Sequence, residues 1–406
     1  MTLNIKSNAL AIAGSLTLLI APLTLTAEEE EKRISYLEQQ LQQLQRLANQ
    51  PAQERLRFNG FLSVGYGLAS NDGGYADFTE EGTFKNESLF GLQGSFTISD
   101  NTEVIMQLVG RGSDGWEPTL EWAYISHNFT PDFKVRAGKM RMPLFMYSDS
   151  LEVGYAQPWL RPPEEVYGGI PVTSYIGIDG IYDFQLNNST LSAQLFGGES
   201  EEELTISGQP TVLIIDNLFG TVISWTDFTW TLRANYATSE ISTGGSLLET
   251  DFYGAGASFN NGVWQVISEF TRLEIDGPTT DVDSAYLTLA RNFGGITPYF
   301  TYSIRSSQDD QERPLSRGAA FAAIANPDSP FFGNTAILSA SDIQNVERTA
   351  YSVGIRWEAT TSVSLKFDIT HATDFGDTGG GLDGNLAPEV LYDDVNLYSI
   401  KLDAAF

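Results

Sequence analysis

The chain has 406 residues, of which 52 are Asp or Glu, 23 are Lys or Arg, two are His and none is Cys. The lack of cysteine excludes disulfide frameworks and thiolate metal sites, and two histidines leave little material for a zinc centre or a histidine relay, so we expect no cofactor. A formal net charge of −29 opposes contact with phosphate backbones, so we expect no nucleic-acid partner.

Residues 1–27 have the pattern of a secretory signal peptide. Lys6 supplies a positive n-region, residues 9–20 form a short apolar core, and small residues before Ala27 offer a cleavage site. Small and polar residues and Pro22 interrupt the apolar stretch, which makes a transmembrane anchor the weaker interpretation. The later sequence has no long uncharged apolar run, so it excludes helical membrane spans but not the alternating strands of a barrel.

Residues 28–50 are predicted to form a helix that ends before Pro51. Its apolar residues recur at spacings of three and four, as in a coiled-coil seam. The seam consists of Ile34, Leu37, Leu41, Leu44 and Ala48. Two heptads are too few to associate alone in water, so we expect a periplasmic coiled coil in an oligomer that the rest of the chain assembles. The alternative is a lone amphipathic helix packed on its own chain.

From residue 56 onward the apolar residues recur with a period of two, which is typical of strands with one apolar and one polar face. Leu62, Val64, Tyr66 and Leu68, for example, alternate with small or polar residues. We predict sixteen strands in a single unit that spans residues 51–406. They cover residues 57–69, 87–98, 102–111, 118–129, 132–139, 174–187, 190–198, 212–225, 227–238, 250–260, 262–273, 282–293, 295–305, 346–358, 362–373 and 394–406.

The predicted connections alternate between tight turns and longer loops. Acidic residues gather in the long connections, at Glu199, Glu201, Glu202, Glu203, Asp309, Asp310, Glu312, Asp374, Asp377, Asp383 and Glu389. Aromatic residues flank the tight turns, at Phe129, Phe133, Trp225, Phe228, Phe259, Trp264 and Phe293.

This pattern predicts an all-β fold, a transmembrane antiparallel β-barrel of about sixteen strands with a short N-terminal helix. In hydrocarbon an open sheet edge leaves backbone groups unpaired, so the first and last strands must meet. A barrel of this size leaves an aqueous channel. A soluble β-sandwich is the alternative, but it requires neither the consistent apolar face nor the alternation of turn lengths.

The connection over residues 140–173 is long, apolar and rich in proline, so we expect it to fold into the barrel and narrow the channel. Four cations lie within eight residues at its start, and a fifth lies within it. These are Lys134, Arg136, Lys139, Arg141 and Arg161. The loop also carries the carboxylates Asp149, Glu152, Glu164 and Glu165. The cations predict a basic constriction that favours anions despite the negative total charge.

Further charged residues share the parity of the polar face and are predicted to line the lumen. They are Arg233, Arg305, Arg356, Lys366, Lys401, Asp179, Asp183, Glu269, Asp368 and Asp403. Taken one at a time, each is also consistent with a solvated wall charge that has no selective role.

Two stretches of this loop, Arg141 to Leu144 and Trp159 to Tyr167, resemble sequences in porins of marine and related gamma-proteobacteria. The whole chain resembles the Gram-negative trimeric porins in its signal peptide, sixteen strands, inward third long loop and terminal Phe406. The heptads resemble the periplasmic stalks of dicarboxylate-specific and phosphate-selective trimeric porins, but the lysine ladder expected of phosphate-selective members is absent.

The resemblance implies a homotrimer in the outer membrane of a Gram-negative bacterium. Its implied partners are membrane lipid, lipopolysaccharide, the barrel-assembly machinery and small hydrophilic solutes. In that family the terminal aromatic, within an alternating strand such as Tyr398 to Phe406, is the signal for barrel insertion.

The leading hypothesis for function is passive diffusion of small hydrophilic, preferably anionic solutes, which requires no catalytic residue. A barrel hydrolase is one alternative, although His127 and His371 are far apart and no Gly-x-Ser-x-Gly elbow occurs. A non-conducting adhesin or cell-wall tether that uses residues 28–50 is another. Ion conductance separates both from a porin.

Overall fold

The computed structural model describes residues 55–170, 172–206, 209–242, 247–276, 281–308, 317–334, 345–386 and 392–406. All of these belong to one unit, Ala52–Phe406. The predicted signal peptide (1–27) and coiled-coil helix (28–50) lie outside the described residues, so both stay predictions.

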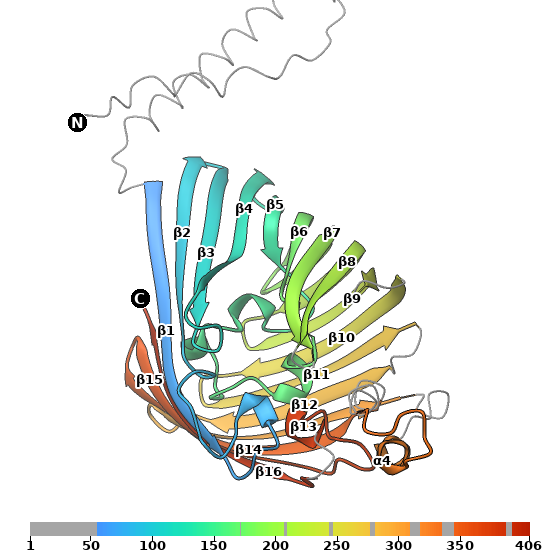
Figure 1. Ribbon diagram of the computed structural model, residues 1–406. Helices are drawn as coiled ribbons and strands as arrows, with labels where there is room; N and C mark the ends of the chain where they lie inside the picture. Colours follow the sequence, from blue (N-terminus) through green and yellow to red (C-terminus); the bar gives the residue numbers. More distant parts are fainter. Residues whose placement is uncertain are drawn as a thin grey trace, which may run out of the picture. The chain divides into compact units, whose positions relative to one another are not determined.

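The described residues form a closed barrel of sixteen antiparallel strands, as predicted. Each strand pairs with its neighbours in the chain, and the first strand pairs with the last (Figure 1). The strands are β1 (Leu56–Ala69), β2 (Leu89–Ser99), β3 (Thr102–Arg111), β4 (Pro118–Thr130), β5 (Phe133–Arg141), β6 (Ser174–Leu186), β7 (Ser189–Ile206), β8 (Gln209–Thr226), β9 (Trp230–Ser242), β10 (Leu248–Asn260), β11 (Trp264–Ile275), β12 (Val282–Arg291), β13 (Ile296–Ser307), β14 (Glu347–Thr360), β15 (Val363–Thr373) and β16 (Val395–Ala405).

Helical segments within the described ranges are short and lie in connections. They are η1 (Tyr75–Asp77), η2 (Ser148–Ser150), η3 (Gly154–Ala156), α3 (Glu164–Tyr167), α4 (Arg317–Ala325) and η4 (Asp383–Leu386). None of the helices in this part of the chain has the length and apolarity needed to cross a membrane.

Side chains alternate between the two faces of the barrel wall, as the period-two pattern predicts. In β1 the inward Ser63 is 1% exposed, whereas the outward Val64 is 43% exposed. The same alternation leaves a band of large apolar side chains exposed on the outside of the barrel, including Ile178, Phe270, Val353 and Ile400. The outer face is thus apolar and the inner face is mainly polar.

Connections of up to four residues join β2–β3, β4–β5, β6–β7, β8–β9, β10–β11, β12–β13 and β14–β15 at one rim. Aromatic side chains are exposed at this rim, with Phe129 at 61%, Phe228 at 87% and Phe293 at 56% exposure. Most of the connections at the other rim are longer, and the connection between β5 and β6 is among the longest.

The β7–β8 connection corrects one prediction. The acidic residues Glu199 and Glu201 to Glu203 do not lie in a long loop, because β7 continues to Ile206 and β8 begins at Gln209. Glu202 pairs with Leu213, and Glu203 pairs with Val212. The β-branched and apolar partners on β8 favour an extended conformation, which charge alone did not reveal.

The C-terminus closes the barrel at the rim of short turns. The Gly60 amide donates to the Phe406 carbonyl at 2.7 Å, and the Phe406 amide donates to the Gly60 carbonyl at 2.9 Å. The Phe406 ring is 77% exposed, and a Cβ atom on Gly60 would approach Cε2 of this ring to 2.5 Å. A glycine at this position therefore leaves room for the terminal ring to lie across β1.

Candidate functional site: the loop inside the barrel

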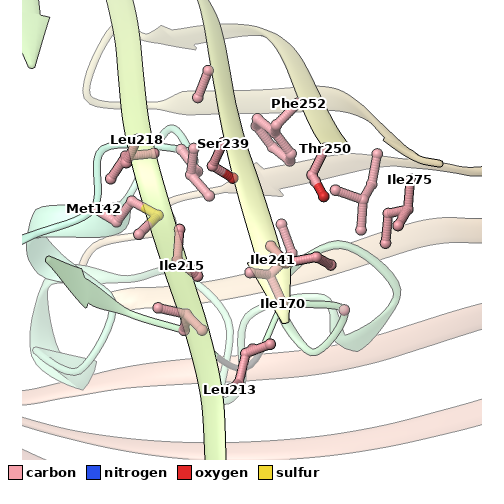
Figure 2. Close-up of a pocket in the computed structure, with 15 residues that line it drawn as sticks. Met142, Ile170, Leu213, Ile215, Leu218, Ser239, Ile241, Thr250, Phe252 and Ile275 are labelled. Atoms are coloured by element: carbon pink, nitrogen blue, oxygen red, sulfur yellow. The ribbon is translucent and has the colours of Figure 1, made fainter. Parts of the chain in front are cut away.

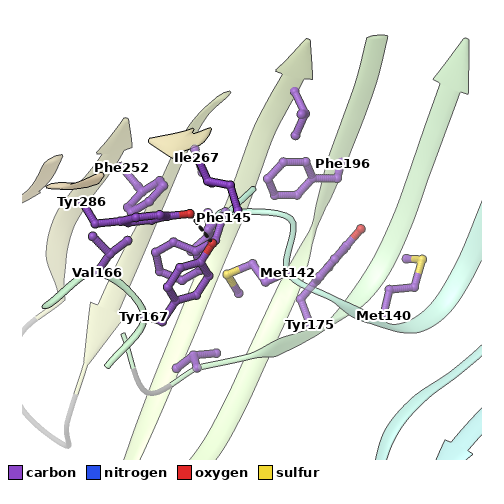
Figure 3. Close-up of a cluster of buried hydrophobic side chains, with 14 of the residues drawn as sticks. Met140, Met142, Phe145, Val166, Tyr167, Tyr175, Phe196, Phe252, Ile267 and Tyr286 are labelled. Atoms are coloured by element: carbon purple, nitrogen blue, oxygen red, sulfur yellow. Dashed lines mark hydrogen bonds between the residues drawn. The ribbon is translucent and has the colours of Figure 1, made fainter. Parts of the chain in front are cut away.

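The β5–β6 connection folds into the barrel, as predicted, although Met140 and Arg141 still belong to β5. Figure 3 shows its apolar side chains, among them Phe145, Val166 and Tyr167, against residues that the wall strands point inward. Phe252 and Tyr286 of the wall contact this cluster, with the Phe145 and Phe252 ring centroids 5.7 Å apart. Burial of these side chains against the wall explains why so long a loop takes a defined position.

Three adjacent wall cations hold the loop backbone. Arg356, Lys366 and Lys401 pair side by side on β14, β15 and β16. Their side chains donate to carbonyl oxygens of the loop. The contacts are Arg356 to Gln157 at 2.9 Å, Lys366 to Gly154 at 2.6 Å and to Trp159 at 2.9 Å, and Lys401 to Leu160 at 3.1 Å.

Buried carboxylates balance these cations. Asp403 lies 2.9 Å from Nζ of Lys366 and accepts a hydrogen bond of 2.6 Å from Ser63. Glu87 pairs with Lys401 at 3.1 Å and with Arg161 of the loop. Burial by itself raises the pKa of Glu87, but Arg161 and Lys401 outweigh it and hold this pKa below its ordinary value.

A second anchor joins α3 to the wall and to the β1–β2 connection. Glu165 is fully buried and accepts hydrogen bonds from Arg348 at 2.8 Å, Ser303 at 2.6 Å and Tyr75 at 3.2 Å. Within the described ranges, no comparable set of hydrogen-bond donors surrounds the neighbouring Glu164. Burial raises the pKa of Glu164, and Arg348 opposes this effect only in part.

A third anchor lies at the start of the loop. Arg233 donates to the Pro143 carbonyl at 2.7 Å, and Glu269 accepts from the Met146 amide at 2.6 Å and from Tyr167 at 2.7 Å. Asp183, also on the inner face, pairs with Ser192 of the neighbouring strand. The predicted wall residues therefore face inward, and five of the ten bond directly to the loop, namely Arg233, Glu269, Arg356, Lys366 and Lys401.

In the described part of the chain, the structure does not contain the predicted basic constriction, because carboxylates lie beside most of its cations. Arg136 forms a bidentate pair with Asp179, with Nη2 2.5 Å from Oδ2. Arg141 is 6% exposed and lies 3.4 Å from Glu121 and 3.2 Å from Glu152. Carboxylates thus neutralise Arg136, Arg141 and Arg161, because the fold brings distant strands and loops beside these cations.

Lys139 is a further correction. It pairs with Ile176, which is 57% exposed on the outer face, so the register places Lys139 outside the lumen. Lys134, on the opposite face of the same strand, is exposed toward the interior. Of the four cations at the start of the loop, only Lys134 faces inward without a carboxylate partner in the described part of the chain.

The charges that remain available to a solute form a smaller set. Asp149 is exposed on the loop and acts electrostatically on Arg136 of β5 and Arg233 of β9. We call Lys134, Arg233 and Asp149 the constriction set. Arg305, on β13, lies beside Gly169 of the loop and has no ion pair among the described residues.

Sequence reasoning missed several of the anchoring residues, including Glu87, Arg111, Glu121, Tyr75 and Arg348. Arg348 has the same parity as Arg356 on β14, so the alternation of the strand was enough to predict that its side chain faces inward. Glu121 lies at a bulge between β3 and β4, where simple alternation fails. It accepts from Arg111 at 2.6 Å.

No protein-family model and no curated protein matches the sequence. Solved structures match its fold. A loop-L8 deletion mutant of OmpT, an outer membrane protein of Vibrio cholerae, superimposes with a TM-score of 0.54 at 10% identity, over 86% of this chain and 99% of that one. An anion-selective porin from Comamonas acidovorans gives 0.55 at 13% identity, over 86% and 99%. The outer membrane channel DcaP of Acinetobacter baumannii gives 0.53 at 9% identity, over 86% and 97%. The chain thus has the fold of a sixteen-strand, porin-like outer-membrane barrel.

Proposed function

We propose that the protein is a porin in the outer membrane of a Gram-negative bacterium, through which small hydrophilic solutes diffuse passively. The observation that carries this proposal is a long loop held by buried ion pairs and hydrogen bonds inside a closed barrel with a mainly polar inner face. Such a loop narrows a barrel of this strand number without requiring any catalytic group.

The orientation and partners belong to the same proposal. The apolar outer band contacts lipid, the aromatic rim of short turns lies in the periplasmic interface, and the long connections face the outside, where lipopolysaccharide is. Residues 28–50 form a periplasmic coiled coil in a homotrimer, and Phe406 with the preceding strand from Tyr398 is read by the barrel-assembly machinery. One of the similar structures is a trimer form of OmpT from Vibrio cholerae.

For selectivity, we propose only a modest preference for anions. Arg136, Arg141 and Arg161 are paired with carboxylates, so the predicted basic constriction no longer supports a strong preference. The support comes instead from Lys134 and Arg233, which have no carboxylate within ion-pair distance in the described ranges. Asp149, which is exposed on the loop, opposes them.

Conductance of the purified full-length protein in a planar bilayer tests the proposal. We expect stepwise insertions with an ohmic current, and a reversal potential of the anionic sign in a KCl gradient. Insertion of folded protein without current would refute the porin function. A reversal potential of the cationic sign would refute only the anion preference.

A hydrolase is a poorer fit to the described residues. His127 and His371 alternate with inward residues of their strands and so lie on the outer face of the barrel. Each already has a hydrogen-bond partner, Thr102 at 2.8 Å and Asn396 at 3.0 Å. An adhesin or cell-wall tether needs no open pore, so the conductance measurement separates it from a porin.

A further inference from the structure

An apolar cavity of about 200 Å³ lies between the inward loop and the inner wall of β8, β9, β10 and β11. Figure 2 shows lining residues from the loop, such as Met142 and Ile170, together with lining residues from the wall, such as Ile241 and Phe252. The cavity extends from the middle of the wall to the long-loop ends of these strands. It is separate from the charged constriction set, none of whose members lines it.

The lining of this cavity is unlike that of a path for hydrophilic solutes. None of its fifteen lining residues is charged, and only Ser239 and Thr250 carry a hydroxyl group. An ion that entered would lose its hydration without gaining a counter-charge, which is strongly unfavourable. The cavity therefore selects against charged molecules.

Thr250 provides a second, independent observation. Its residue is 8% exposed, and its Oγ1 atom is buried without a hydrogen-bond partner among the residues that the structure describes. A buried hydroxyl without a partner is costly, and proteins of known structure rarely retain one without a reason. Because Thr250 lines the cavity (Figure 2), a molecule with an oxygen atom at this point would satisfy the hydroxyl group.

We propose that this cavity binds an uncharged molecule of about the size of a substituted benzene ring that carries one carbonyl or hydroxyl oxygen. The apolar body packs between the loop and the wall, and the oxygen forms a hydrogen bond with Thr250. Cavities of about 150 Å³ lined by Leu, Ile and Phe hold one benzene molecule, so the size fits. This site goes beyond the proposed channel function and does not depend on ion conductance.

The absence of cysteine from the chain permits a direct test with acetophenone as the probe. Ser239→Cys places the only thiol of the protein in the cavity wall, and methyl methanethiosulfonate reports its accessibility. We expect acetophenone to slow labelling in a saturable manner and benzoate, which is charged, to have no effect. Adding Thr250→Val should weaken the apparent affinity for acetophenone about fivefold, the usual effect of losing one hydrogen bond.

Controls distinguish binding in the cavity from effects on lipid or on folding. Ser224→Cys lies on the inner face of β8, outside the cavity, and its labelling should not respond to acetophenone. Ala237→Leu fills the cavity but keeps the Thr250 hydroxyl, and should abolish protection of Ser239→Cys. Equal protection of both thiols, equal protection by benzoate, or an unchanged affinity in Thr250→Val would overturn the proposal.

Discussion

The ammonium group of Lys366 donates to the carbonyl oxygen of Trp159 at 2.9 Å, although the two residues are 207 positions apart in the chain. Lys366 is 0% exposed and Trp159 is 2% exposed. A cation that sequence parity assigns to the lumen is therefore beneath the loop, where it holds the loop backbone against β15. This relationship changes how the other wall cations are interpreted, because Arg356 and Lys401 make the same kind of contact.

The Lys366 anchor leads to a first prediction. Lys366→Met should lower the free energy of unfolding by about 3 kcal/mol, because it leaves the Asp403 carboxylate buried with Ser63 but without its Lys366 partner. The freed loop should also make single-channel currents noisier. Urea unfolding followed by tryptophan fluorescence, with bilayer recordings, measures both effects. Lys134→Met, which removes an exposed lysine on the same inner face, is the matched control and should change neither.

A second prediction concerns ion selectivity. Asp149→Asn should shift the reversal potential toward anions, and Lys134→Gln or Arg233→Gln should shift it toward cations. Asp149 is exposed on the inward loop, Arg233 contacts that loop, and Lys134 faces the lumen near the rim of short turns. Neutralising Glu201, Glu202 and Glu203 together should have little effect, since charges on the extended β7–β8 hairpin are screened over about 8 Å at physiological salt. A larger shift from these three glutamates than from Asp149 would mean that the constriction lies elsewhere.

A third prediction uses the opposite pKa directions of two loop-associated carboxyls. The pKa of Glu87 is lowered in the folded protein, so its stabilising contribution is present above the unfolded pKa of about 4.3 and is lost as the pH falls through the lower folded pKa. Glu87→Gln should therefore be less stable than the native chain at pH 7, and the difference should shrink as the pH falls below about 4.3. Melting temperatures in detergent across this range test the difference.

Glu164 supplies the matched control for this measurement. Its pKa is raised by burial, so its ionisation costs stability above that pKa and the cost disappears as the pH falls. Glu164→Gln should thus equal or exceed the native melting temperature at pH 7. An equal decrease in melting temperature in both variants at pH 7 would show that lost packing, and not lost charge, destabilises them.

A fourth prediction concerns the C-terminus. Deleting Phe406 removes the two backbone hydrogen bonds with Gly60 and the outward ring at the rim of short turns. We expect fewer folded barrels in the outer membrane and more degraded chain in the periplasm, as measured by heat-modifiable mobility in gels. Phe406→Tyr keeps an aromatic ring and should insert normally. A normal yield from the truncated chain would contradict the prediction.

A fifth prediction concerns residues 28–50, which lie outside the described part of the chain. Two heptads are too weak to assemble an oligomer alone, so deletion of this segment should leave a trimer with a lower dissociation temperature. Chemical cross-linking and gels run at stepped temperatures measure this. Complete conversion to monomer would show that the coiled coil is the main assembling element.

Local sequence patterns were sufficient to predict the barrel wall. Alternation such as that of Leu62, Val64 and Tyr66 depends only on neighbours in the same strand, so it predicted sixteen strands and the inward face of Lys366 and Asp179. The apolar, proline-rich composition of the β5–β6 connection likewise indicated that it folds inward. The sequence did not predict the bulge at Glu121 or the extended strand pairing at Glu202, because both depend on the partner strand.

Which charges a solute can reach depends on how the loop packs inside the barrel. Arg161 meets Glu87 across 74 positions, and Arg348 meets Glu165 across 183 positions. These ion pairs form because the loop packs against the closed wall, so a local sequence pattern cannot predict them. A buried cation is stable only when a carboxylate or carbonyl oxygen satisfies it. Most cations of the predicted basic constriction are therefore paired in the folded protein, and Lys134, Arg233 and Asp149 are the charges that face the channel.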